Sequence, residues 1–363
     1  MADPDAPIYR DLWKEYKMVM EKTKKPKMFK QFKWQDIIDH LRVISHDMID
    51  YGEREQLGQI YRSMADVFEK MDKPLDQRLH YLKAARVFAK LMKDRFEMRY
   101  STESDFSTQM EDNYLQAVQL SIKMGLPHMA GTILSELAHN YTEVRKYELA
   151  HRYFLKSARI LSGSFFDSVA VMKSIIENAA HCDDMNEPLA DLFSLWQVLS
   201  KKYPHREHID ATPTQASEEV RVSLRALELD FILISIRRYL KQDELGKSIL
   251  TDYVGVFSPN LRTSVLLAGE FEEVSKFIAA CKKRDHYTAE GIYVGILFPM
   301  LDELGKKLMK DVVGLMQGSE TTRPDLTEIS NEPDTDVRDR MKKLFEFYTL
   351  HHREKTKKAE FYD

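Results

Sequence analysis

Between about residues 54 and 202, the sequence repeats one arrangement, in which an amphipathic segment of helical length is followed by a short break. The breaks fall near residues 71–74, 100–106, 125–127, 142–146, 162–164 and 183–188. Connections this short make consecutive helices antiparallel neighbours. Strand signals are missing, because the sequence has no Asn-Gly or Asp-Gly turn and no sustained alternation of apolar and polar residues. The pattern therefore predicts an all-α protein.

The composition agrees with this prediction. Glycine and proline number 13 and 12 among 363 residues, which is too few for the many tight turns of a sheet-rich fold. The apolar fraction of 43% is enough for a buried core. The formal net charge of −4 argues against nucleic acid as the main partner, because phosphate binding requires a basic surface. The two cysteines, Cys182 and Cys281, lie far apart, so we exclude a disulfide scaffold and expect a reducing cytosolic or nuclear setting.

Neither the N-terminus nor the apolar stretches indicate a membrane segment. The first residues, Met1–Asp5, lack the basic and apolar parts of a secretory signal. The longest apolar stretch, Phe231–Ile236, lies between Asp230 and Arg237 and is too short to span a bilayer. We therefore expect membrane contact only through a partner or a surface patch.

One segment carries the spacing of a tetratricopeptide repeat. The positions are occupied by Leu134, Leu137, Ala138, Tyr141, Ala150, Phe154 and Ser157. In this motif large residues fill the space between two helices, and small residues such as Ala138 and Ala150 let the helices approach closely. The pattern predicts a tetratricopeptide-like antiparallel helical-repeat superhelix, with an irregular helical bundle as the alternative. A repeat array of this kind presents extended faces for binding other proteins.

A second segment follows the same spacing more loosely. Its positions are occupied by Tyr61, Met64, Ala65, Phe68, Gln77, Tyr81 and Ala84. Gln77 stands where the motif has a small residue, and neither segment has the glycine or the closing proline of the consensus. Two matches within one helical stretch favour a repeat array over a chance resemblance.

Changes in composition divide the chain into five parts. Residues 1–53 hold N-terminal helices with a basic segment, and residues 54–202 hold the repeat array. Residues 203–217 lack apolar periodicity and are interpreted as a linker loop. Residues 218–317 contain apolar helical repeats, some of them apolar nearly all round, so we expect a partner to cover part of them. Residues 318–363 form a charged tail that we expect to be mostly disordered.

The basic segment is the strongest candidate for a contact site. It contains Lys22, Lys24, Lys25, Lys27, Lys30, Phe29 and Phe32. Clustered lysines with aromatic residues among them suit an anionic surface. Because the rest of the chain is not basic, we expect an acidic patch on a protein partner. The alternative is a solvated helix start.

Motifs for catalysis are missing from the sequence. No glycine-rich phosphate loop, zinc-protease motif, Cys-x-x-Cys pair or nucleophile elbow is present. His205 and His208 have metal-ligand spacing, but no third ligand is in view, and a solvated loop explains them. His181 and Cys182 are neighbours that cannot face each other on a helix, so we interpret them as core packing. Cys281 precedes basic residues that would lower its thiol pKa, and we interpret it as a helix-end residue. We therefore expect neither enzyme activity nor a cofactor nor a metal.

Three stretches resemble a known family. The opening helix Tyr9–Met20 runs into the basic stretch Lys22–Lys30. Tyr81–Phe88 reads YLKAARVF, and the family has a helix with EAARLF. Glu177–Cys182 reads ENAAHC and is followed by PLADLF at Pro188–Phe193, where the family shows EAASC and then GALAVF. On these residues the chain resembles the 40-kDa huntingtin-associated proteins, as a divergent, invertebrate-type member.

The resemblance covers about residues 8–317 and implies a function. A member of this family would be a non-enzymatic subunit that binds huntingtin as a 1:1 heterodimer, between the HEAT-repeat regions of that protein. It would be cytoplasmic, with possible nuclear and early-endosome pools, and linked to endosomes through the small GTPase Rab-five. The linker 203–217 is short where the family can carry a proline-rich insert, and the tail 318–363 has no recognised counterpart. The family is also related to the soluble NSF attachment proteins, so a membrane-fusion adaptor that binds SNARE bundles and an ATPase is the alternative.

Overall fold

The computed structural model describes residues 11–24, 33–98, 106–182, 187–202, 215–241 and 265–317. In these ranges every regular element is a helix, and no residue belongs to a strand. The chain divides into two compact units, which we call unit 1 (Met1–Leu195) and unit 2 (Trp196–Asp363). The boundary falls inside the helix α9 rather than in the predicted linker.

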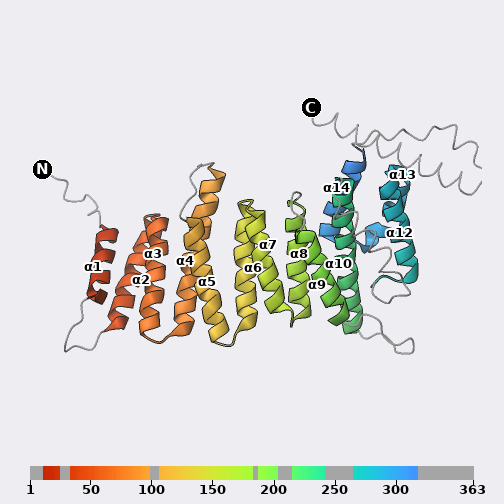
Figure 1. Cartoon of the computed structure of the whole chain (residues 1–363). Helices are drawn as coiled ribbons and strands as arrows, with labels where there is room; N and C mark the ends of the chain where they lie inside the picture. The colour runs from red at the N-terminus through yellow and green to blue at the C-terminus, as the bar shows by residue number, and fades with distance from the viewer. Residues whose placement is uncertain are drawn as a thin grey trace, which may run out of the picture. The chain divides into compact units, whose positions relative to one another are not determined.

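Unit 1 is a row of helices that stand side by side in chain order (Figure 1). The helices are α1 (Leu12–Lys24), α2 (Trp34–Asp50), α3 (Arg54–Lys70), α4 (Pro74–Glu97), α5 (Phe106–Lys123), α6 (Pro127–Glu143), α7 (Tyr147–Leu161), α8 (Phe165–Ala179) and α9 (Glu187–Lys202). From α1 to α8, consecutive helices pack against each other, most extensively in the pairs α3–α4, α4–α5 and α6–α7. The predicted all-α antiparallel helical-repeat fold is confirmed.

Four of the described turns that join these helices share one geometry. Gly52, Asp72, Gly125 and Arg145 each adopt a positive φ directly after a helix. The next residue then donates its backbone N–H to a carbonyl five residues earlier, as Lys73 does to Phe68 and Lys146 does to Tyr141. This pattern closes the helix end and satisfies carbonyls that would otherwise lack a partner. Repeated tight turns make successive helices antiparallel.

Polar contacts place α4, α6 and α8 beside one another. Arg86 on α4 donates to Glu136 on α6 with a distance of 2.7 Å between Nε and Oε1. His128 on α6 lies 2.7 Å from the carboxylate of Asp167 on α8. These three helices point the same way, because each is separated from the next by one antiparallel helix. We call them the even layer.

A second set of contacts places α5, α7 and α9 beside one another. Tyr153 on α7 donates its hydroxyl to Glu111 on α5. His151, buried on α7, lies 3.2 Å from the carboxylate of Asp191 on α9. We call these helices the odd layer. Unit 1 is therefore two layers thick along this stretch, and each layer has its own outer face.

Two glycines mark equivalent contacts in the two repeat segments. A Cβ atom on Gly58 would lie 2.6 Å from Phe88, and one on Gly131 would lie 2.5 Å from Leu161. Each glycine precedes its contact residue by the same interval, 58 to 88 and 131 to 161. The α3–α4 and α6–α7 pairs thus pack alike. However, the single helix α5 lies between the two pairs. As a result, α3 and α6, the first helices of the two pairs, lie in opposite layers.

Ala150 tests the packing of the repeat. Its side chain is fully buried on α7, which packs closely against α6. Replacing Ala150 with Leu adds three carbon atoms to this contact and should lower the free energy of unfolding by ~1–3 kcal/mol. Denaturant unfolding of the full chain measures the change. An unaltered midpoint would contradict close packing at this position, and Ser162→Leu, at an exposed turn residue, is the matched control.

Unit 2 contains α10 (Gln215–Leu240), α12 (Ala268–Lys283), α13 (His286–Ile292) and α14 (Glu303–Gln317). Between α13 and α14 the chain forms a π-helical turn at Tyr293–Leu297 and a 3₁₀ turn at Phe298–Met300. α10 begins at Gln215, within the range predicted to be a linker, and residues 203–214 lie outside the described ranges. The predicted tail 318–363 also lies outside them.

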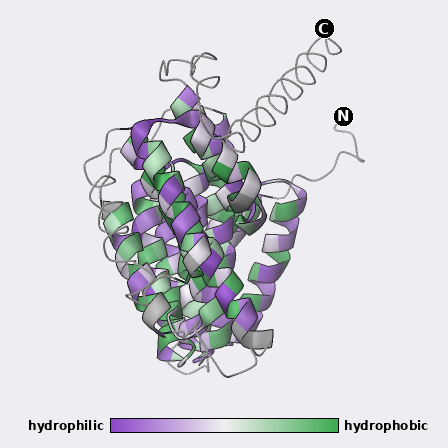
Figure 2. Cartoon of the chain, turned by 90° about the vertical axis from the view of Figure 1, so that its right-hand side faces the viewer, coloured by the Kyte–Doolittle hydropathy of each residue, from purple (hydrophilic) through white to green (hydrophobic). Residues whose placement is uncertain are grey.

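Most of the α10 side chains are buried. Leu227, Phe231 and Ile234 are each at most 1% exposed, and α10 packs against α14 and α12. Two carboxylates on this helix are also buried, and Glu228 accepts a hydrogen bond of 2.8 Å from the backbone N–H of Val265. The chain itself therefore covers most of α10, and the expectation that a partner covers part of residues 218–317 stays a prediction. No helix among the described residues combines the length and apolar character needed to cross a membrane. Figure 2 shows that hydrophilic residues recur along the helices.

Candidate interaction surfaces

The predicted basic segment lies mostly outside the described residues. This applies to Lys25, Lys27, Phe29, Lys30 and Phe32. Lys22 is exposed near the end of α1, and Lys24 is the last residue of that helix. The prediction that this segment contacts an acidic surface stays a prediction.

The predicted repeat-packing residues all lie in the core of unit 1. The set comprises Leu134, Leu137, Ala138, Tyr141, Ala150 and Phe154, and each is at most 3% exposed. Tyr141 does more than fill space, because its hydroxyl donates to Glu111 on α5. Tyr153 donates to the other oxygen of the same carboxylate. Burial is the main cause that raises the pKa of both tyrosines, and the Glu111 hydrogen bond adds to it.

Two ion pairs join α4 to α6 on the even layer. Arg86 binds Glu136 through two nitrogens, at 2.7 and 2.9 Å, and Lys93 lies 3.3 Å from Glu143. In both pairs the partners are 50 positions apart (86 to 136 and 93 to 143). The two helices are therefore in register over two turns, and their charges neutralise each other. Tyr114, buried beneath, also donates to Glu136 at 2.8 Å.

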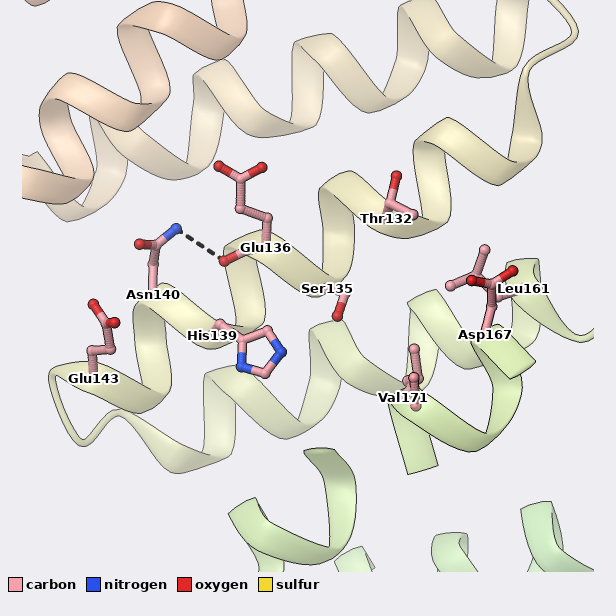
Figure 3. Close-up of a pocket in the computed structure, with 10 residues that line it drawn as sticks. Thr132, Ser135, Glu136, His139, Asn140, Glu143, Leu161, Asp167 and Val171 are labelled. Carbon is pink, nitrogen blue, oxygen red and sulfur yellow. Dashed lines mark hydrogen bonds between the residues drawn. The ribbon is translucent and has the colours of Figure 1, made fainter. Parts of the chain in front are cut away.

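A groove of about 500 Å³ runs beside these ion pairs, between α6 and α8. Figure 3 shows Ser135 and His139 on the α6 side and Asp167 and Val171 on the α8 side. The His139 ring meets Phe154 edge-on at 4.9 Å between centroids. The lining mixes hydroxyl, imidazole, carboxylate and aliphatic groups.

The contribution of Glu136 to the stability of the protein depends on pH. Burial raises the pKa of this carboxyl, but the hydrogen bonds from Arg86 and Tyr114 and the Arg86 charge outweigh burial and leave the pKa below its usual value of 4.5. A lowered folded-state pKa stabilises the protein above about pH 4.5, and this stability is lost as the pH falls through the folded-state pKa. At neutral pH, Glu136→Gln should cost roughly 1 kcal/mol, since the site is partly exposed.

The stability difference between wild type and Glu136→Gln should shrink as the pH falls below about 4.5. Urea unfolding at a series of pH values measures it. The control is Glu148→Gln at an exposed position on α7, for which we expect a small difference at every pH. A Glu136→Gln difference that stays constant with pH would contradict the assigned role of the carboxylate.

Exposed apolar side chains form a row across the even layer. Leu79 on α4, Met129 on α6 and Phe166 on α8 are 45%, 39% and 62% exposed. The interval of 50 positions that relates the ion-paired residues also relates Leu79 to Met129, so these two lie at one level. The contact from His128 to Asp167 brings the neighbouring residues Met129 and Phe166 to the same level. We call Leu79, Met129 and Phe166 the apolar row.

The odd layer carries a basic stripe instead. Arg152, Lys156 and Arg159 are exposed along one side of α7, at spacings of four and three residues. Lys156 lies over the Tyr153 ring at 4.8 Å. No ion pair joins these three side chains to a carboxylate within the described part of the chain. We call Arg152, Lys156 and Arg159 the α7 basic stripe.

The two cysteines are buried rather than reactive. Cys182 and Cys281 are both free thiols in the core. The basic residues after Cys281 suggested a lowered pKa, but burial raises the pKa of its thiol to about 12. The expectation of a lowered thiol pKa was therefore wrong, because the Cys281 side chain faces the interior and not the charged helix end. Within the described ranges, no group of His, Cys, Asp and Glu side chains has the arrangement of a metal site.

The surfaces of unit 1 define a helical-repeat protein with extended faces and no assembled reaction centre among the described residues. No protein-family model and no curated protein matches the sequence. Among solved structures, BtubC (BKLC) from P. vanneervenii aligns with 69% of this chain and 94% of its own, at 14% identity and a TM-score of 0.30. A likeness this weak carries no argument about function.

Proposed function

We propose that this protein is a non-enzymatic scaffold subunit that binds a large HEAT-repeat protein of the huntingtin type. The apolar row is the observation that supports the proposal most. Three large, exposed apolar side chains at one level of three adjacent helices favour burial against a partner. The resemblance of the sequence to the 40-kDa huntingtin-associated proteins supplies the identity of that partner.

The membrane-fusion adaptor is less well supported by the same face. An adaptor for acidic SNARE bundles needs an unneutralised basic surface. On α4 the basic residues Arg86 and Lys93 are paired with Glu136 and Glu143. Two of the basic residues on this face are therefore paired within the protein, whereas the apolar row stays 39% to 62% exposed.

Affinity purification of the full chain from native cells, followed by mass spectrometry, tests the proposal. We expect recovery of one very large HEAT-repeat protein at about 1:1 stoichiometry. Recovery of SNARE proteins with a hexameric ATPase instead would contradict it. The double variant Leu79→Glu with Phe166→Glu should reduce recovery of the large protein at least tenfold, because two carboxylates would have to be desolvated in the contact.

A matched control keeps this test specific. Met18→Glu with Ile122→Glu adds the same charge at exposed apolar positions on α1 and α5, which do not belong to the even layer. We expect the control to recover the partner at the wild-type level. Equal loss in both variants would show a general effect of charge and would argue against the apolar row as the contact.

A further inference from the structure

The α7 basic stripe follows from the way α7 packs. The buried side of this helix is formed by Ala150, Tyr153, Phe154, Ser157, Ala158 and Leu161. Arg152, Lys156 and Arg159 fall on the opposite side and are exposed. Their spacing of four and three residues corresponds to about 6 and 4.5 Å along the helix axis. Three cations thus follow one line about 10 Å long.

The neighbouring helices do not neutralise this line. The α5 carboxylate nearest in the packing, Glu111, accepts hydrogen bonds from Tyr141 and Tyr153. The α9 carboxylate Asp191 is bonded to His151. Glu111 and Asp191 are therefore engaged by α6 or α7 side chains other than those of the stripe.

The even layer offers a direct comparison. There α4 carries Lys83, Arg86, Lys90 and Lys93 at the same three- and four-residue spacing, and α6 supplies carboxylates to two of them. The protein thus pairs alternate members of one basic stripe, Arg86 and Lys93, and the two lysines that remain, Lys83 and Lys90, are two helical turns apart. All three members of the other stripe are without an ion pair in the described ranges. A row of exposed like charges is unfavourable by itself, and an acidic partner would remove that cost.

We propose that the α7 basic stripe is a docking site for an acidic α-helix of a protein partner. A helix displays carboxylates at three- and four-residue spacing with the same axial distances as the stripe, so three ion pairs can form without distortion of either helix. Duplex nucleic acid fits less well, because the stripe is one residue wide and the chain has a net charge of −4. This inference deepens the proposed function by assigning the chemistry of a second contact, on the layer opposite to the apolar row.

The test uses the full chain and a labelled synthetic helical peptide with Glu at three- and four-residue spacing in an alanine-rich background. Fluorescence anisotropy at low salt should show binding that weakens as salt is added. The triple variant Arg152→Glu, Lys156→Glu and Arg159→Glu should bind at least about tenfold more weakly, since three attractions become repulsions. The control Lys83→Glu with Lys90→Glu, on the exposed side of α4, should stay within about twofold of wild type.

Several outcomes would overturn the inference. They are no peptide binding by the wild type, equal weakening in the triple variant and the control, and tighter binding of a random-sequence DNA duplex or of phosphatidylserine-containing vesicles than of the peptide. Circular dichroism of both variants confirms that they keep the helical fold. Because the peptide assay does not involve the native partner, its failure leaves the purification result standing. Conversely, failure to recover a HEAT-repeat protein would not affect the peptide result.

Discussion

Replacing Glu111 with Ala should lower the free energy of unfolding of unit 1 by ~2–4 kcal/mol. The carboxylate of Glu111 accepts hydrogen bonds from two tyrosine hydroxyls, one on α6 and one on α7. Tyr141 is fully buried and Tyr153 is 5% exposed, so water replaces the lost acceptor poorly. A hydrogen bond to a charged group contributes ~1.5–3 kcal/mol, and an unsatisfied buried donor costs ~1–3 kcal/mol.

Two further variants separate the hydrogen bonds from the charge. Glu111→Gln keeps one acceptor and adds a donor, so each tyrosine keeps a partner and the loss should be less than half that of Glu111→Ala. Tyr153→Phe removes one bond, and a double-mutant cycle with Glu111→Ala should give a coupling of ~1–2 kcal/mol. Denaturant unfolding of the full chain measures all of these variants. A change below about 0.5 kcal/mol for Glu111→Ala would show that the carboxylate does not hold the three helices together.

Depletion of the partner from cells should shorten the half-life of this protein several-fold without lowering its messenger. On the proposed function, the partner binds only the folded state and stabilises it by RT ln(1 + [L]/Kd), which is ~4 kcal/mol at a thousandfold excess over Kd. That is a large fraction of the ~5–15 kcal/mol by which a typical domain is stable. Depletion would also expose the apolar row, which then becomes a site for aggregation and degradation.

Pulse-chase labelling with the partner present and depleted measures this effect. The Leu79→Glu, Phe166→Glu variant is the informative comparison, because it should be short-lived even when the partner is present. An unchanged half-life on depletion, together with a monomeric purified chain that melts sharply, would refute an obligate subunit and favour a transient adaptor.

The sequence predicted the architecture because the relevant information is local. The break expected near residues 71–74 is a turn at Met71–Lys73, and the one near 142–146 is a turn at Val144–Lys146. Apolar periodicity also placed residues such as Leu134 and Phe154 where the core lies. Such signals depend on residues three or four positions apart, which one sequence displays directly.

The surfaces were harder to predict because they depend on pairing between distant residues. Glu111 is 30 positions from Tyr141 and 42 from Tyr153, and no local pattern indicates that the three meet. The spacing of the basic residues on α4 and α7 is similar in the sequence. Only the structure distinguishes them, since Glu136 and Glu143 reach α4 and no described carboxylate reaches the α7 basic stripe. The direction of the Cys281 pKa shift was also hard to predict. Burial of the side chain raises this pKa and outweighs the basic residues that follow it in the sequence.

The alternation of layers limits how such an array can change in length. Because α5 separates two hairpins that pack alike, helices of equivalent sequence already lie on opposite sides of the protein. Loss or gain of a whole hairpin would preserve the side on which every later helix lies. Loss of the single helix α5 would exchange the two sides for the rest of unit 1. It would place Met129 and Phe166 on the side opposite to Leu79 of α4, and the α7 basic stripe on the same side as Leu79. Gain or loss of whole hairpins is therefore compatible with binding of the same partner. Deletion of one helix would instead separate the two halves of the surface that binds it.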